Sequence, residues 1–169
     1  KSLWQEVELV QLYDTVFTAL GLEGVTIKIN NRKILSGIAE VIGASDKLID
    51  FTVALDKLDK IGEDGVKKEM IEKGISEEAI AKVQPLFSFT GTIAEKIKQL
   101  SQLLSVSVEG MKGVEELQFI CEKVTQLGLA TAQLDLDVTL ARGLNYYTGA
   151  IFEIAPPKTV AMGSIGGGG

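Results

Sequence analysis

Residues 132–155 read AQLDLDVTLARGLNYYTGAIFEIA and contain the clearest two-residue period of the chain. From Ala132 to Val138, apolar residues alternate with Gln133, Asp135 and Asp137. This period is typical of a strand with one buried face. Residues 150–155 are nearly all apolar, which suits a strand covered on both faces. The stretch therefore predicts two strands of one sheet.

The residues that follow predict a third strand and an incomplete end. Pro156-Pro157-Lys158 is typical of a turn, and residues 160–165 return to an apolar pattern. Two strands joined by a short turn favour an antiparallel hairpin. The chain then stops at four glycines, Gly166 to Gly169, which are costly to order at the end of a domain. We therefore expect both ends to be cut from a longer protein.

The residues before this stretch are mostly helical. A capping box at Ser2 and Gln5 predicts a first helix that ends at Gly21, and residues 25–29 predict a short strand. Residues 32–128 carry helical periodicity. Helix starts are indicated at Ser45, Ser76 and Thr92, and helix ends at Gly62, Gly74, Pro85 and Gly128. The fold class is therefore α+β: residues 1–31 and 129–169 form a partial sheet domain, and residues 32–128 form a helical insertion.

Composition limits the classes of function. The 169 residues are 46% apolar and 24% charged, with a net charge of −6, which is a globular balance. Because only Arg32 and Arg142 are arginines, the chain alone is expected to bind nucleic acid weakly. No histidine and a single cysteine argue against a zinc site, and Cys121 lies on an apolar helical stripe, as a core residue would. No membrane span or signal pattern is present, which predicts a cytoplasmic protein.

Three features of the last thirty residues suggest a binding site. The guanidinium of Arg142 suits carboxylate or phosphate oxygens, or an ion pair with Asp135, Asp137 or Glu153. Of two adjacent tyrosines in extended backbone, one packs while the other can present its hydroxyl to a pocket; the alternative is two ordinary sheet residues. The terminal glycines allow close approach to a ligand, although no P-loop or dinucleotide fingerprint follows.

The motifs resemble those of one enzyme family. Residues 141–153 resemble the first histidine-specific motif of histidyl-tRNA synthetase, commonly Arg-Gly-Leu-Asp-Tyr-Tyr followed by Phe-Glu, with Asn145 in place of the aspartate. Residues 164–169 resemble the start of the second motif. Asn30, Arg32, Leu35 and the run 51–58 resemble the segment that leads into the helical insertion of a branch of this family.

The resemblance implies a class II aminoacyl-tRNA synthetase with an antiparallel catalytic sheet. Such an enzyme joins histidine to ATP as histidyl-adenylate and then transfers histidine to tRNA. Arg142 would be catalytic, contacting the carboxylate and the α-phosphate. Tyr146, Tyr147, Gly167 and Gly168 would bind histidine. ATP would arrive with Mg²⁺ as substrate, without a tightly bound cofactor or a protein metal site, and the parent enzyme would be a cytoplasmic homodimer.

The other parts of such an enzyme are missing from the sequence. It contains no class II dimer motif, no motif 2 arginine loop, no motif 3 and no anticodon-binding domain, so we expect the chain to be inactive alone. Two alternatives stay open: a synthetase-like regulatory paralogue without aminoacylation, and a helical interaction module formed by residues 32–128. The sequence also leaves open which tyrosine faces the histidine pocket.

Overall fold

The computed structural model describes residues 2–157, 159–160 and 162–169. Within these residues the elements are α1 (Leu3–Ala19), β1 (Thr26–Asn31), α2 (Arg32–Val41), the short 3-10 helix η1 (Ser45–Lys47), α3 (Leu48–Asp56), α4 (Leu58–Glu72), α5 (Glu77–Phe87), α6 (Ile93–Leu103), α7 (Val108–Leu127), β2 (Gln133–Leu136), β3 (Ala150–Ala155) and β4 (Gly166–Gly168). The predicted α+β class is confirmed, including the change from helices to strands near residue 129.

The four strands form one sheet in the order β2-β1-β3-β4. β3 pairs antiparallel with both β1 and β4, as expected of a synthetase-type sheet. β1 and β2 pair parallel, with Ile29 opposite Leu136. Parallel neighbours require a crossover connection, and here all of α2 to α7 lies between the two strands. β1 is therefore a central strand whose two neighbours come much later in the chain.

The position predicted for the third strand was wrong. Residues 160–165 lie outside β4, which instead uses Gly166 to Gly168. The antiparallel pairing is confirmed, with Phe152 opposite Gly168. Within β4 the tightest position is Gly168, where a methyl group would lie 2.5 Å from the hydroxyl of Tyr13 in α1. Lys158 of the predicted turn and Ala161 of the predicted strand lie outside the described residues.

Helix ends agree with the sequence where a local cap forms. Ser76 and Thr92 accept hydrogen bonds from the backbone N–H groups at the starts of α5 and α6. Gly62, a predicted helix end, has non-helical backbone angles with φ of 74° and ψ of 175°, so the helical backbone is interrupted within α4 at the residue where the sequence predicts an end. Pro85 lies within α5, which continues to Phe87. Proline has no N–H to donate to the carbonyl four residues earlier, and α5 ends two residues after Pro85.

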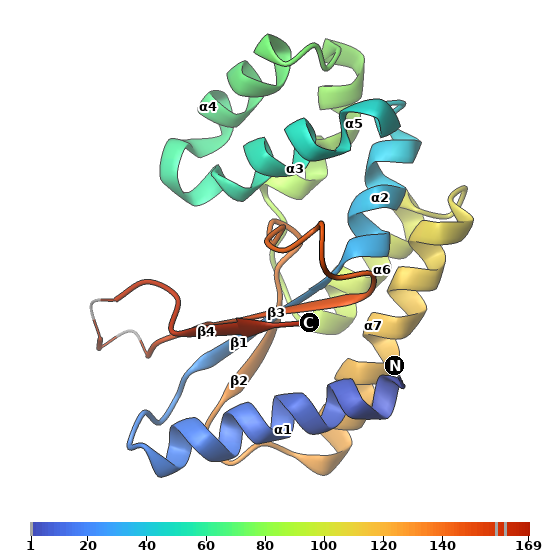
Figure 1. The fold of residues 1–169 in the computed structure, drawn as a ribbon. Coiled ribbons are helices and arrows are strands. Elements are labelled where there is room, and N and C mark those ends of the chain that lie inside the picture. The colour runs from blue at the N-terminus through green and yellow to red at the C-terminus, as the bar shows by residue number, and fades with distance from the viewer. Residues whose placement is uncertain (1, 158, 161) are drawn as a thin grey trace.

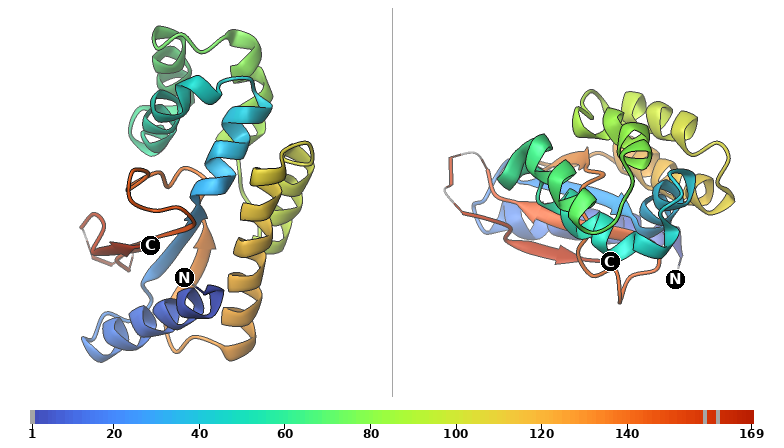
Figure 2. Two further views of the ribbon diagram at one scale, coloured as in Figure 1. Left: turned by 45° about the vertical axis from the view of Figure 1, so that its right-hand side comes forward. Right: turned by 90° about the horizontal axis from the view of Figure 1, so that it is seen from above.

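The helices lie on opposite sides of the sheet. Helix α1 crosses below it, α7 runs alongside, and α2 leads from β1 to the group formed by α3, α4 and α5 above (Figure 1). The left view of Figure 2 shows the same separation. Helix α7 packs against α1, α2, β1 and β3, so it joins the sheet to the helices. The division into residues 32–128 and the rest of the chain stays a prediction.

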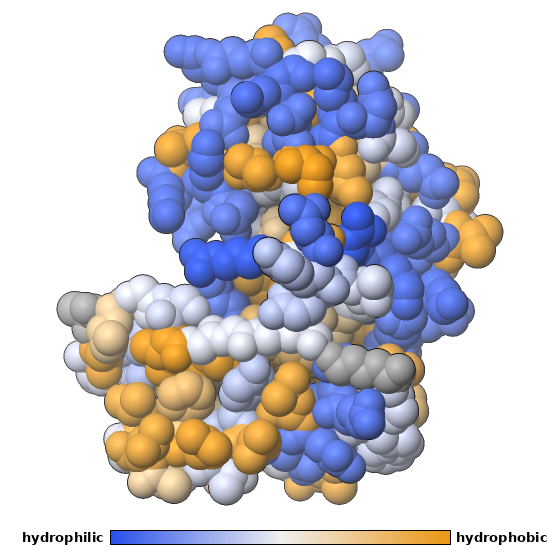
Figure 3. Space-filling view, in the orientation of Figure 1, coloured by the Kyte–Doolittle hydropathy of each residue, from blue (hydrophilic) through white to orange (hydrophobic). Residues whose placement is uncertain are grey.

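The core runs along the sheet into α7. Fully or almost fully buried apolar residues include Val7, Val10, Ile27, Ile29, Ile34, Leu117, Ile120, Phe152 and Ile154. Cys121 is buried, which confirms its predicted place in the core. Burial is the main reason that the pKa of its thiol is raised to about 12. Apolar side chains also gather on the lower surface over α1 (Figure 3), where Leu12, Val16 and Leu20 are exposed. None of the described helices has both the length and the apolarity to cross a membrane.

Candidate substrate site

The loop that carries the predicted site is fastened at the junction of β1 and α2. Asn30 is fully buried, and its side-chain amide donates to the carbonyls of Val138 at 3.1 Å and Leu140 at 2.9 Å. Arg32 is the first residue of α2, at the predicted helix start. Its backbone N–H donates to the Gly149 carbonyl at 2.9 Å, and its Nε donates to the Leu144 carbonyl at 2.9 Å. Asn30 and Arg32 therefore hold the beginning, middle and end of the loop.

The loop turns where the two tyrosines were expected to be extended. Gly143 has φ of +71°, a conformation that favours glycine, and its carbonyl accepts the N–H groups of both Tyr146 and Tyr147 at 2.9 Å. The side chain of Tyr146 is 85% exposed. The ring of Tyr147 is partly buried and fills the space that side chains would need at Gly143 and Gly169. The two tyrosines therefore differ in exposure, although both lie in a turn and not in the extended backbone that was expected.

A cavity of about 450 Å³ brings the predicted site residues together. Its lining includes Arg142, Tyr146, Tyr147, Gly167 and Gly168. The guanidinium of Arg142 lies 3.2 Å from the carboxylate of Glu153 on β3, so one of the partners considered from sequence is confirmed. The Arg142 side chain is 63% exposed, and a guanidinium with five N–H donors can hold one carboxylate and still donate to a ligand.

The terminal glycines face alternate sides of the sheet. Gly167 lies opposite Glu153, whose side chain faces the cavity, and Gly168 lies opposite Phe152. A methyl group on Gly167 would lie 3.3 Å from the Phe152 carbonyl, whereas one on Gly168 would meet α1. The lack of a side chain at Gly167 therefore leaves room in the cavity, and the lack of one at Gly168 leaves room for α1.

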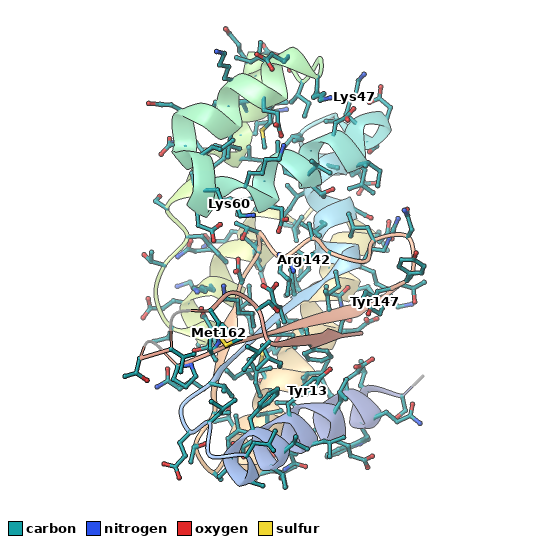
Figure 4. The ribbon with its side chains drawn as sticks, turned by 60° about the vertical axis from the view of Figure 1, so that its left-hand side comes forward. Tyr13, Lys47, Lys60, Arg142, Tyr147 and Met162 are labelled. Carbon is teal, nitrogen blue, oxygen red and sulfur yellow. The ribbon has the colours of Figure 1, made fainter. Side chains whose placement is uncertain are left out.

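Tyr13 is a site neighbour that sequence reasoning missed. Its hydroxyl donates to the Gly167 carbonyl at 3.1 Å, from the side of the sheet opposite Arg142 (Figure 4). Burial, followed by the nearby Tyr147 and Glu6, raises the pKa of Tyr13. The sequence does contain one signal for this contact. Tyr13 lies on the apolar stripe of α1, three residues after Val10 and four before Phe17. A tyrosine on such a stripe is at least partly buried and usually needs a hydrogen-bond partner for its hydroxyl.

The corner between α3 and α4 lies directly over Arg142. Asp56, Asp59 and Lys60 line a small cavity of about 60 Å³ together with Arg142 and Glu153. Figure 4 shows Lys60 facing the loop that carries Arg142. Burial raises the pKa of Asp56, and the nearby Arg142 opposes that rise. Charged residues of the helical segment therefore surround the arginine that the sequence identified.

The fold and site together define a class II aminoacyl-tRNA synthetase type of structure. The family model for histidyl-tRNA synthetase matches residues 1–169, and the chain belongs to that family. A histidine–tRNA ligase of Flavobacterium johnsoniae is 88% identical over 169 residues, covering 100% of this chain and 36% of that ligase. The crystal structure of histidyl-tRNA synthetase from Nostoc sp. is 31% identical with a TM-score of 0.83, covering 92% of this chain and 37% of that one.

The chain spans little more than a third of the length of these relatives. A structure from Bacillus halodurans, titled as an ATP phosphoribosyltransferase regulatory subunit/histidyl-tRNA synthetase, matches with a TM-score of 0.78 at 18% identity. It covers 96% of this chain and 41% of that one. At that identity the likeness shows a shared fold alone.

Proposed function

We propose that this chain forms part of the catalytic domain of a histidine–tRNA ligase and lines its histidine and adenylate site. The observation that carries the proposal is the single cavity of about 450 Å³ that Arg142, Tyr147 and Gly167 share. A ligand bound there would meet a cation, an aromatic hydroxyl and an open backbone. Those groups suit the carboxylate, imidazole and backbone of histidine.

Arg142 would act on the charge that moves during adenylation. The carboxylate of histidine attacks the α-phosphate of ATP, so an oxygen–phosphorus bond forms and pyrophosphate leaves with the electron pair of the bond that breaks. Phosphoryl transfer of this kind depends on positioning and on neutralising negative charge. Glu153, at 3.2 Å, would hold the guanidinium of Arg142 in place at the rim of the cavity.

Tyr147 is the better candidate for the histidine side chain. Its ring lies between Gly143 and Gly169 inside the cavity lining, whereas Tyr146 is 85% exposed. A hydroxyl on a ring held by packing would recognise an imidazole nitrogen at a small entropic cost, and a polar pocket rejects analogues that lack this nitrogen. Tyr146 would then lie at the entrance to the cavity.

The other substrates and partners of such a ligase are ATP, tRNA and a second copy of the full-length protein, in the cytoplasm. Among the described residues, no three Asp, Glu, Cys or His side chains are arranged to hold a metal ion. In the proposed reaction, magnesium would arrive bound to ATP as part of the substrate. A regulatory role is less well supported, because the relative at 88% identity is a ligase and the structure titled as a regulatory subunit is 18% identical.

The test uses a chimera in which residues 1–169 replace the matching segment of the Flavobacterium johnsoniae ligase. Histidine-dependent ATP–pyrophosphate exchange measures adenylation. We expect the unsubstituted chimera to be active and Arg142→Ala to lower kcat by roughly 100-fold to 1000-fold, the usual cost of losing a donor aimed at developing charge. Tyr147→Phe should instead raise the KM for histidine by roughly twofold to tenfold, because one hydrogen bond to a neutral group is lost.

Lys82→Ala is the matched control for the loss of a cation, since Lys82 is an exposed residue of α5 outside the cavity lining. Its kinetics should equal those of the unsubstituted chimera. The proposal fails if Arg142→Ala keeps its kcat and Tyr147→Phe keeps its KM for histidine. Arg142 would then be only the ion-pair partner of Glu153.

A further inference from the structure

Tyr13 connects helix α1 to the glycine strand that forms the floor of the cavity. Besides its 3.1 Å hydrogen bond to the Gly167 carbonyl, the Tyr13 ring lies 6.5 Å from the ring of Phe152 on β3, at an interplanar angle of 60°. Edge-on aromatic contacts at such distances are favourable. The two contacts fix Tyr13 against β3 and aim its hydroxyl at β4.

Strand β4 has few other means of holding its position. Its three residues are glycines, which have no side chains to pack and lose more conformational freedom on ordering than other residues do. Within the described residues, its only strand partner is β3. A side-chain hydrogen bond to the middle glycine therefore restrains the segment that lies against a ligand in the cavity.

The hydroxyl of Tyr13 can fill this role only while it carries its proton. Burial is the main reason that the pKa of Tyr13 is raised, and the nearby Tyr147 and Glu6 act in the same direction. An unperturbed tyrosine already titrates near pH 10. Tyr13 is therefore a hydrogen-bond donor throughout the pH range in which an enzyme of this kind would be assayed.

We propose that Tyr13 is a positioning residue for the histidine site, which sets the place of Gly167 from the opposite side of the sheet. The inference rests on the proposed function and extends it to a residue that does not line the cavity. Losing this hydrogen bond should loosen the floor on which histidine lies and weaken its binding. Arg142, which neutralises charge in the transition state, lies on the other side and should keep its effect on kcat.

The fit between Tyr13 and Gly168 gives the inference a second, geometric consequence. A methyl group on Gly168 would lie 2.5 Å from the Tyr13 hydroxyl oxygen, but 3.8 Å from Cζ of the same ring and 3.9 Å from Cδ2 of Leu9. The first distance is a clash with one atom, and the other two are ordinary contacts. Removing the hydroxyl should therefore make room for alanine at position 168.

The experiment measures ATP–pyrophosphate exchange with the same chimera. Tyr13→Phe should raise the KM for histidine by roughly twofold to tenfold, the range for one lost hydrogen bond, with kcat and the KM for ATP within twofold of the unsubstituted chimera. Gly168→Ala should raise the KM for histidine more. The double variant Tyr13→Phe with Gly168→Ala should have a lower KM for histidine than Gly168→Ala alone. Leu12→Ala, at the exposed neighbouring position of α1, should match the unsubstituted chimera.

The outcomes separate this inference from the proposed function. If the unsubstituted chimera catalyses no histidine-dependent exchange, the proposed function fails and the inference fails with it. If that chimera is active but Tyr13→Phe leaves the KM for histidine unchanged, the inference alone is wrong. It is also wrong if the effects of Tyr13→Phe and Gly168→Ala simply multiply, because the hydroxyl would then not be the atom that alanine meets.

Discussion

The carboxylate of Asp14 organises the loop that brings the chain back to the sheet. Its oxygens accept backbone N–H groups from Ala130 at 2.6 Å, Thr131 at 3.1 Å and Ala132 at 2.9 Å, directly before β2. Burial alone would raise the pKa of this carboxyl group, but the three backbone donors outweigh it and lower the pKa. Asp14 is thus a charged residue of α1 that defines the start of a strand about 120 residues away.

Replacing Asp14 should destabilise the fold and change its acid response. We expect Asp14→Ala to lower the free energy of unfolding by roughly 2–4 kcal/mol, because partly buried N–H groups lose their acceptor. A lowered pKa stabilises the fold above the unfolded-state value of about 3.9, and this contribution disappears as the pH falls through the folded-state value. Urea unfolding of the chimera at pH 7 and at several values below pH 4 measures both effects.

Glu8, an exposed carboxylate on the same helix, provides the control through Glu8→Ala. The free energy of unfolding of the Glu8→Ala variant should differ from that of the unsubstituted chimera by less than about 0.5 kcal/mol, as is usual for surface positions. Equal losses for Asp14→Ala and Glu8→Ala would contradict the role given to Asp14. So would an Asp14→Ala variant that loses as much stability below pH 4 as the unsubstituted protein.

Among the elements, α2 and α7 cross where both lack side chains. A methyl group on Gly37 of α2 would lie 2.5 Å from the Cα atom of Gly110 in α7. One on Gly110 would lie no closer than 3.0 Å to its neighbours, and the nearest is the flexible side chain of Leu104. The two helices therefore approach at backbone distance, which fixes the angle at which α2 leaves the sheet.

Alanine at these two positions should have unequal effects. Gly37→Ala forces backbone apart, and overpacking of this kind costs roughly 1–3 kcal/mol, more than the gain of up to about 1 kcal/mol in helix propensity. Gly110→Ala should cost less, because a side chain can move aside. Thermal unfolding of the two variants, compared with Glu40→Ala on the exposed face of α2, measures the difference. A Gly37→Ala variant as stable as Gly110→Ala would show that the helices separate freely.

Elements with local signals could be predicted from the sequence, and those with distant partners could not. Ser76 and Thr92 begin helices through hydrogen bonds to residues three positions later, so the necessary information is adjacent in the chain. Strand β4 depends on the packing of α1 beneath it, whereas the apolar pattern of the sequence predicts a strand at residues 160–165. The Tyr13–Gly167 hydrogen bond joins residues 154 positions apart, a pairing that no local pattern contains.

At the scale of the whole molecule, the helical segment contacts the sheet domain at both of its ends, and its α3–α4 corner lies next to the cavity that Arg142 lines. Helices α2 and α7 make the connection, and Asp56, Asp59 and Lys60 lie around Arg142. The motif residues were recognised in the sequence, and the cavity brings them together. The nearness of the α3–α4 corner could not be predicted, because it depends on how α2 is directed by its crossing with α7.

The strand order also makes a prediction about partly synthesised chains. β1 ends at Asn31 and β2 begins at Gln133, while β3 ends only at Ala155. We expect ribosome-bound chains that expose residues 1–128 to be cut rapidly by protease near residues 25–31, and chains that expose all 169 residues to resist. Cleavage near residues 64–72 of α4, which needs no distant strand, should differ less between the two lengths. Equal resistance at residues 25–31 would mean that β1 is protected without its neighbours.

The late arrival of both neighbours of β1 has a consequence for how a cell makes this chain. At roughly 5–20 residues per second, the synthesis of about 100 residues leaves β1 without neighbouring strands for roughly 5–20 s. During this time the backbone N–H and C=O groups of β1 are unpaired, and they can pair with the same strand of a chain on the next ribosome of the same messenger RNA. The length of the helical segment thus sets a period of aggregation risk, and a slower ribosome or a longer insertion would extend it.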